Sequence, residues 1–185
     1  MDNMDNEQKK TDQDNTEQKK TDMEKTDQVN TITKTLTRAA LIAALYAALT
    51  IFVMPISYGV MQFRVSEALT VLPVFTPAAI PGLFVGCLVA NIVSPVGLVD
   101  VIIGSAATLL AALLTYLLRE HRLLALLPPV LTNAILVGTE LYYFYNVDFS
   151  LPACMFWVGL GEMGACYLLG YPLSLLLDKH KNLFK

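Results

Sequence analysis

The sequence predicts an all-α integral membrane protein with six transmembrane helices and both termini in the cytoplasm. Hydrophobic residues make up 55% of the chain and charged residues only 16%, whereas soluble domains carry about 25% charged residues. After residue 36 the apolar residues form long runs without any charge. The basic residues that bound these runs recur at intervals that place them on one side of a membrane.

The first 35 residues differ in composition from the rest of the chain. They contain nine of the sixteen acidic residues, and the motif EQKKTD at 7–12 returns at 17–22. Such a segment has little to bury, so we expect residues 1–35 to be a disordered, low-complexity tail. Residues 36–185 form the predicted membrane domain, which is formally neutral, so its charge does not indicate a nucleic-acid partner.

Each predicted helix follows from a run without charges and from the prolines that interrupt the runs. No charged residue occurs between Ala39 and Phe63, which predicts one span that ends before Pro55. The uncharged run 68–99 is too long for one crossing, and its prolines divide it into a short helix and a longer one. The predicted helices lie at about 37–54, 65–75, 78–94, 98–118, 123–145 and 152–177.

The basic residues predict the orientation of these helices. With the amino terminus inside, only Arg64 falls on the outer side. The chain is therefore predicted to be a multi-pass protein of the plasma membrane. The residues predicted on the cytoplasmic side are Lys34, Arg38, Arg119, Arg122, Lys179, Lys181 and Lys185.

Four acidic residues lie within the predicted spans, where an ionisable group is costly and therefore a candidate for function. They are Glu67, Asp100, Glu140 and Glu162, and the predicted topology places all four in the outer half of the membrane, with Asn91 nearby. Four helices would thus direct carboxyl groups to one level. We expect a polar pocket that opens to the outside.

Structural roles compete with ligand binding at two of these residues. Asp100 would also suit the start of a helix, where its charge meets the positive end of the dipole. Glu67 follows Arg64 by three residues, so the two would also suit an ion pair. Glu140 and Glu162 have no basic residue within one helical turn, so a cationic or donor-rich ligand would satisfy them.

Aromatic residues flank the last two acids, at Tyr142–Tyr145 and at Phe156 and Trp157. They would suit an interfacial belt, because Tyr and Trp favour the depth of the lipid headgroups. Acids interleaved with aromatic rings would equally suit a flat heterocycle that carries amine or amide donors.

Small residues recur every four positions on the first predicted span. One row is Ala39, Ala43 and Ala47, and the other is Ala40, Ala44 and Ala48. Such a face lets a second helix approach closely, either from this chain or from a partner subunit. The glycines of GLFVG at 82–86 offer a similar face.

Several activities are not expected of this chain. It has no P-loop, no HExxH and no GxSxG motif, so we expect neither an enzyme nor ATP hydrolysis by the chain itself. Its three cysteines lie in apolar stretches without a CxxC motif, so we expect no metal site and no cofactor.

The most specific sequence signals occur together in the membrane domain. They are QFRVSEALTVLP at 62–73, IPGLFVG at 80–86 followed by Asn91, GTELYY at 138–143 and GLGE at 159–162. Over about residues 36–180 the chain resembles the QueT family, which are substrate-binding S components of energy-coupling factor (ECF) transporters assigned to queuosine precursors.

The resemblance implies a six-helix S component with a binding site near the outer surface, gated by the loop at about 55–64. It also implies association with a membrane coupling subunit and two cytoplasmic ATPases, and ATP-driven toppling in the lipid bilayer. The small-residue face would contact the coupling subunit through Ala39, Ala43 and Ala47, or through the register one residue later at Ala40 and Ala44.

The implied ligand is a deazapurine, 7-aminomethyl-7-deazaguanine. Its guanine-like edge and its ammonium group would each take one carboxylate, which we assign to Glu140 and Glu162 in either order. Tyr143 and Trp157 would stack on the ring. Arg64, Gln62 and Asn91 would serve the carbonyl or the gate, with Arg64 held to Glu67. The alternatives are an S component for another vitamin-like heterocycle and a solitary proton-coupled carrier.

Overall fold

The computed structural model describes residues 2–57, 62–94, 97–145 and 147–180, with side chains from residue 18 onward. Every regular element in these ranges is helical, which confirms the predicted all-α class. The chain divides into two units between Thr37 and Arg38. The elements are α1 (Asp2–Phe52), α2 (Met54–Ser57), η1 (Val65–Val74), α3 (Ala79–Ile92), α4 (Leu98–Leu117), α5 (Arg122–Ala125), α6 (Leu127–Phe144), α7 (Leu151–Met163), η2 (Gly164–Gly170) and α8 (Tyr171–Lys179).

The first unit is helical, whereas the sequence predicts no regular structure before about Thr37. Helix α1 begins at Asp2, and all side chains from Gln18 to Thr37 are exposed. Glu, Gln and Lys are good helix formers, and five threonine hydroxyls in this unit donate to the carbonyl four residues earlier. The first unit has few apolar residues to bury, but its composition is compatible with a helix that is held by local hydrogen bonds.

Within the described ranges, four helical segments are long and apolar enough to cross a membrane. They are Gln18–Phe52, Leu98–Leu117, Arg122–Phe144 and Leu151–Lys179. The other two predicted spans correspond to η1 and α3, which have ten and fourteen residues. At 1.5 Å per residue, α3 extends about 21 Å and so falls short of a hydrocarbon core of about 30 Å.

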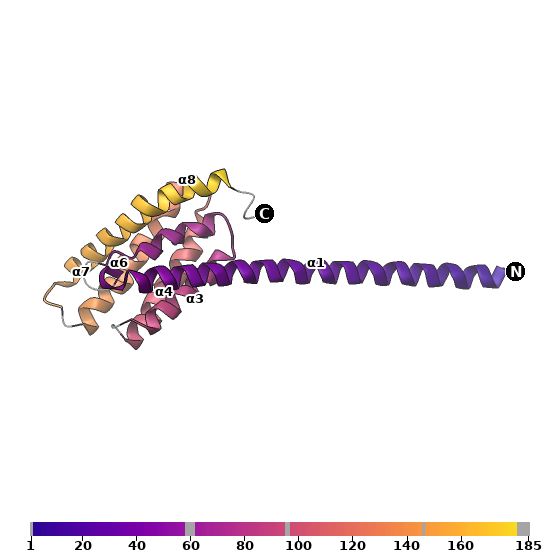
Figure 1. The fold of residues 1–185 in the computed structure, drawn as a ribbon, viewed down its shortest axis with the longest axis horizontal. Coiled ribbons are helices and arrows are strands. Elements are labelled where there is room, and N and C mark those ends of the chain that lie inside the picture. Colours follow the sequence, from indigo (N-terminus) through magenta and orange to yellow (C-terminus); the bar gives the residue numbers. More distant parts are fainter. Residues whose placement is uncertain (1, 58–61, 95–96, 146, 181–185) are drawn as a thin grey trace. The chain divides into compact units, whose positions relative to one another are not determined.

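Helix η1 lies in the interior of the second unit. It packs against α3, α4, α5, α8 and η2, and Figure 1 shows the helices of the second unit gathered into one bundle. Its side chains from Ser66 to Pro73 are all buried. Its bounds agree with the predicted helix at 65–75, but it has the tighter 3₁₀ geometry. Because no face of η1 is exposed over these residues, the polar groups that it carries need partners or ligands inside the protein.

The second unit brings α1 and α3 into close contact through small residues. A Cβ atom on Gly82 would lie 2.8 Å from the Ala39 carbonyl oxygen, and one on Gly86 would lie 2.8 Å from that of Ala43. Ala39 and Ala47 are buried. The spacing leaves open whether these small residues contact a helix of this chain or a partner subunit. The register that begins at Ala39 contacts a helix of this chain. Ala40, Ala44 and Ala48 remain exposed.

Replacing Gly86 by valine is expected to lower the thermal stability of the detergent-solubilised protein by several degrees. The added side chain would overlap the α1 backbone, and overpacking of this kind costs about 1–3 kcal/mol. Unfolding followed by the fluorescence of Trp157 would measure the change. The matched control is Ala44→Val, which enlarges an exposed residue of α1. Equal melting temperatures for the two variants would contradict the assigned packing.

Candidate functional site: a buried cluster of carboxyl groups

Four carboxyl residues from four helices lie in the interior of the second unit. Glu67 of η1 is 0% exposed, and Asp100 of α4, Glu140 of α6 and Glu162 of α7 are each 1% exposed. Asp100 and Glu140 interact electrostatically, and so do Glu67 and Glu162. These four residues are called the acid cluster below. The structure brings together the acidic residues that the sequence singles out.

Arg64 also belongs to this interior, although the sequence places it in an outer loop. Its side chain is 3% exposed, and Nη2 lies 3.7 Å from Asp100 Oδ2. The guanidinium also interacts electrostatically with Glu67, Glu140 and Glu162. Arg64 thus forms an ion pair with Asp100, and the expected pairing with Glu67 stays a prediction. Burial of the guanidinium is tolerated because it interacts with acidic groups.

Glu67 is positioned by α1. The Tyr46 hydroxyl donates a hydrogen bond to Glu67 Oε1, and Tyr46 is completely buried. One turn further along α1, the hydroxyl of Thr50 lies 2.6 Å from that of Ser66. Sequence reasoning missed Tyr46 because it lies in an otherwise apolar run. Its signal is that it carries the one hydroxyl among the residues from 38 to 49.

Glu162 lies in the last turn of α7, just before the chain widens into the π-helical turn η2. The Asn133 side chain of α6 is buried beside its carboxyl group. Asn133 was also missed, although a lone amide in an apolar helix is a recognisable signal. Turns of π-helix are frequent at functional sites, because they shift the side chains that follow.

Glu140 is accompanied by Tyr145 rather than by Tyr143. The Tyr145 hydroxyl lies 3.5 Å from Glu140 Oε1 and donates to it, whereas Tyr143 is 66% exposed and packs edge-on against Tyr142. Tyr145 is the first residue beyond α6, where the helix ends. This exposed position suits an interfacial belt, and the stacking role of Tyr143 stays a prediction.

Asn91 and Asp100 connect α3 to the start of α4. Asn91 Nδ2 donates to the Asp100 carbonyl oxygen at 2.9 Å, and both residues are buried. A Cβ atom on Gly104 would lie 2.7 Å from both side chains, so glycine leaves room for them. Asp100 lies in the first turn of α4, where its charge meets the positive end of the helix dipole, as its expected structural role requires. It also pairs with Arg64.

Several buried acceptor atoms of the cluster lack a hydrogen-bond partner within the described part of the chain. They are Glu67 Oε2, Asp100 Oδ2, Glu140 Oε2 and Glu162 Oε2, and Asn91 Oδ1 next to Asp100 is a further one. Buried polar atoms are paired in the great majority of cases, so unsatisfied ones call for an explanation. A ligand rich in hydrogen-bond donors would satisfy these oxygens.

The family model described as QueT transporter matches residues 36–179. This chain belongs to the QueT transporter family. The match confirms the resemblance drawn from the sequence, and with four helices able to cross a membrane it makes the chain a membrane protein of a transporter family.

One curated relative is the Queuosine precursor transporter QueT of Lactococcus lactis subsp. cremoris (strain MG1363). It is 40% identical over 84 residues, which cover 44% of this chain and 49% of the relative. The aligned part thus spans about half of the relative's length. No solved structure matches the chain.

The motif QFRVSE contributes several buried residues to the interior of this QueT family member. Gln62 and Arg64 are both 3% exposed, and Ser66 and Glu67 are completely buried. Gln62 and Arg64 belong to the end of the predicted gate at 55–64. Residues 58–61 of that gate lie outside the described residues. The described parts are joined by a hydrogen bond from the Phe63 amide to the Ile56 carbonyl oxygen at 2.9 Å.

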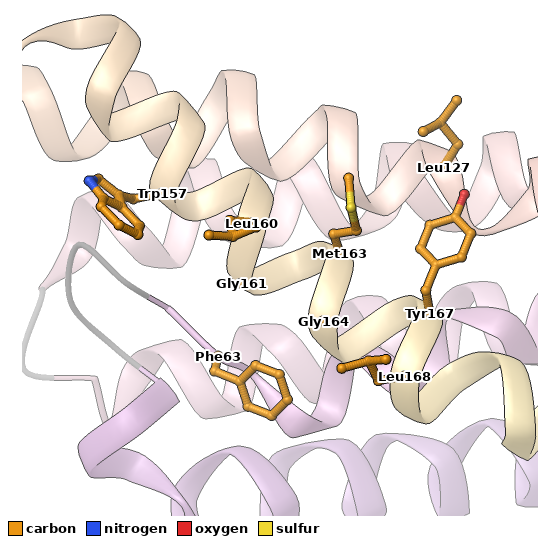
Figure 2. A pocket seen from close by; sticks show the side chains of 9 residues that line it. All are labelled: Phe63, Leu127, Trp157, Leu160, Gly161, Met163, Gly164, Tyr167 and Leu168. Atoms are coloured by element: carbon orange, nitrogen blue, oxygen red, sulfur yellow. The ribbon is translucent and has the colours of Figure 1, made fainter.

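The GLGE motif explains how the end of this loop reaches α7. A Cβ atom on Gly161 would overlap the carbonyl oxygen of Gln62, and one on Gly164 would lie 2.8 Å from the Phe63 ring. Figure 2 shows this ring beside η2, near Gly164. Glycine at position 161 is therefore required for the observed contact between the loop and the residue that precedes Glu162.

An apolar groove of about 640 Å³ runs along the outer side of α7 and η2 (Figure 2). Trp157, Leu160 and Met163 line it, together with Phe63 and Tyr167, but no member of the acid cluster does. We place the candidate site at the acid cluster, because hydrogen-bond recognition needs polar groups. Trp157 thus lines the groove, and its expected stacking role at the cluster receives no support from its position.

Proposed function

We propose that this chain is the substrate-binding S component of an ECF-type importer for a queuosine precursor, 7-aminomethyl-7-deazaguanine. The observation that carries the proposal is the acid cluster, in which four buried carboxyl groups interact electrostatically with one buried arginine. The family match and the name of the Lactococcus lactis relative support the substrate class. The unsatisfied acceptor oxygens support a ligand that brings its own donors.

The ligand has two groups that suit carboxylates. Its guanine-like edge presents adjacent N–H donors, which one carboxylate accepts in a bidentate manner, and its aminomethyl group is a cation. We assign these groups to Glu140 and Glu162, in either order. Asn91 and Gln62 remain candidates for polar contacts to the heterocycle. Tyr46 and Tyr145 hold Glu67 and Glu140 in position, respectively.

The proposal includes six membrane crossings in the plasma membrane, with both termini in the cytoplasm. The basic residues that follow α4 and α8 support this orientation. Helices η1 and α3 would cross only with the help of the loops around them, since each is shorter than the hydrocarbon core. The proposed partners are a membrane coupling subunit and two cytoplasmic ATPases, which would supply the ATP hydrolysis.

Replacing Glu140 or Glu162 by glutamine tests the binding role. Each change is expected to weaken the affinity for 7-aminomethyl-7-deazaguanine by about tenfold or more, because a charged hydrogen bond contributes about 1.5–3 kcal/mol. Calorimetry on the purified full-length protein would measure Kd. The matched control is Asp148→Asn, which neutralises an exposed acid and should leave Kd unchanged. Wild-type affinity in both glutamine variants would contradict the assignment.

A solitary proton-coupled carrier is a second candidate, favoured by the juxtaposition of two buried acids, Glu67 and Glu162. An S component for another vitamin-like heterocycle is a closer alternative. Uptake assays in proteoliposomes separate the classes of transporter. Dependence on co-purified ATPase subunits and on ATP supports the importer, whereas uptake driven by a proton gradient alone supports the carrier. Competition with other heterocycles identifies the ligand.

A further inference from the structure

Arg64 lies inside the protein, beside the carboxyl groups proposed to bind the ligand. It is the one buried Lys or Arg among the described residues with side chains. Its guanidinium pairs with Asp100 and interacts electrostatically with Glu67, Glu140 and Glu162. An arginine stays charged under all ordinary conditions. Arg64 therefore places one fixed positive charge inside the cluster.

The contacts of Arg64 hold this charge in place. Nε donates to the carbonyl oxygen of Ser57 at 3.4 Å, and Nη1 lies 3.9 Å from Cys87 Sγ. Nη2 faces Asp100 at 3.7 Å. The guanidinium thus contacts Asp100 and two neutral groups, Ser57 and Cys87. The second carboxylate oxygens of Glu67, Glu140 and Glu162 have no hydrogen-bond partner in the described ranges, which leaves acceptors for a ligand.

We propose that Arg64 is a specificity-determining residue, whose fixed charge, balanced by Asp100, sets how strongly the site prefers a cationic heterocycle over its neutral isostere. The proposal rests on the proposed function, since it concerns the ligand of the same cluster. Charges in a buried site act over several ångströms, because the effective dielectric there is low. The charge of a cationic ligand interacts electrostatically with both the acids and Arg64, whereas a neutral isostere interacts with either of them far more weakly.

The sign of each effect follows directly. Removing the charge of Arg64 leaves the cluster more negative, so the preference for a cation should rise. Removing the charge of Asp100 leaves Arg64 without its balancing carboxylate, so the preference should fall. Removing both charges leaves the net charge of the cluster unchanged and should restore the wild-type preference. A residue that only supports the fold would alter the affinity for both ligands alike.

The test compares two ligands that differ in one group. They are 7-aminomethyl-7-deazaguanine and 7-hydroxymethyl-7-deazaguanine, in which a neutral hydroxyl replaces the ammonium. The measured quantity is the ratio of their Kd values for the full-length protein. We expect Arg64→Gln to raise the preference for the amine about tenfold, Asp100→Asn to lower it about tenfold, and the double variant to return it to within about threefold of the wild type.

Two further variants complete the design. Arg119→Gln removes an exposed charge that stacks on Tyr116, and it should leave the ratio unchanged. Arg64→Lys keeps the charge, so it should keep the ratio even if both affinities fall. If Arg64→Gln does not fold, Asp100→Asn and Arg64→Lys still decide the matter. An unchanged ratio in Asp100→Asn, or a shifted ratio in Arg64→Lys, would overturn the role of Arg64.

These outcomes are distinct from a failure of the proposed function. If the wild type binds neither deazapurine, the proposed ligand is wrong and the role of Arg64 towards it is wrong as well. If the wild type binds the amine but the ratio does not respond to the charges of Arg64 and Asp100, the proposed function stands and only the specificity role is overturned.

Discussion

Replacing Gly161 by alanine is expected to increase the rate of ligand dissociation by tenfold or more. The added Cβ atom would overlap the carbonyl oxygen of Gln62, and neither group can move without shifting backbone. The loop that ends at Gln62 would have to leave its position on α7, directly beside Glu162. If this loop gates the site, the ligand would then escape faster, and most affinity changes of this kind appear in the dissociation rate.

Stopped-flow displacement of a bound deazapurine from the purified protein would measure this rate. The matched control is Gly159→Ala, two residues earlier on α7, where the added atom would meet only the Cβ atom of Ala134 at 3.2 Å. The melting temperature of both variants shows whether the fold is retained. A Gly161→Ala protein that folds and releases ligand at the wild-type rate would show that the contact with the loop does not retain the ligand.

The members of the acid cluster were predictable because each lies within or beside an apolar run that is long enough to enter a membrane. A carboxyl group at such a position is too costly to face lipid, so its burial follows from the sequence alone. The same reasoning placed Asn91 in the interior and would have found Asn133. Apart from the start of the first helix, the approximate bounds of the predicted helices were predictable for a similar reason, since prolines and charges interrupt the runs.

The position of Arg64 was not predictable from charge counting. The positive-inside pattern treats every basic residue as part of a surface loop, but the side-chain direction depends on the backbone between α2 and η1. Tyr46 and Glu67 are 21 residues apart, and their hydrogen bond depends on how α1 packs on η1. Contacts of this kind belong to the tertiary structure, and no local sequence pattern contains them.

The two alanine registers of α1 show the same limit. Spacing alone does not distinguish the two rows, because every member of each row is small and would let a second helix approach closely. The structure separates them, since Gly82 and Gly86 of α3 pack against the row that begins at Ala39. The remaining row is Ala40, Ala44 and Ala48, which is exposed on a segment able to cross the membrane. This exposed row is where we propose that the coupling subunit docks.

Replacing Ala44 by tryptophan is accordingly expected to reduce ATP-dependent uptake at least tenfold while ligand binding stays at the wild-type level. Helices in a membrane associate through close approach of small residues, and a bulky side chain in the middle of the row would separate the two backbones. The acid cluster would be unaffected, because Ala44 faces away from the interior. Uptake in proteoliposomes that contain the complete importer and Kd of the isolated chain are the two measurements.

The matched control is Ile102→Trp, which places the same ring on an exposed position of α4. It should leave both uptake and binding unchanged. Wild-type uptake by Ala44→Trp would show that the coupling subunit binds another face of the protein. Loss of ligand binding together with uptake would show that α1 supports the site rather than the partner. Only loss of uptake with intact binding fits a helix whose one alanine row packs inside the chain and whose other row faces a partner.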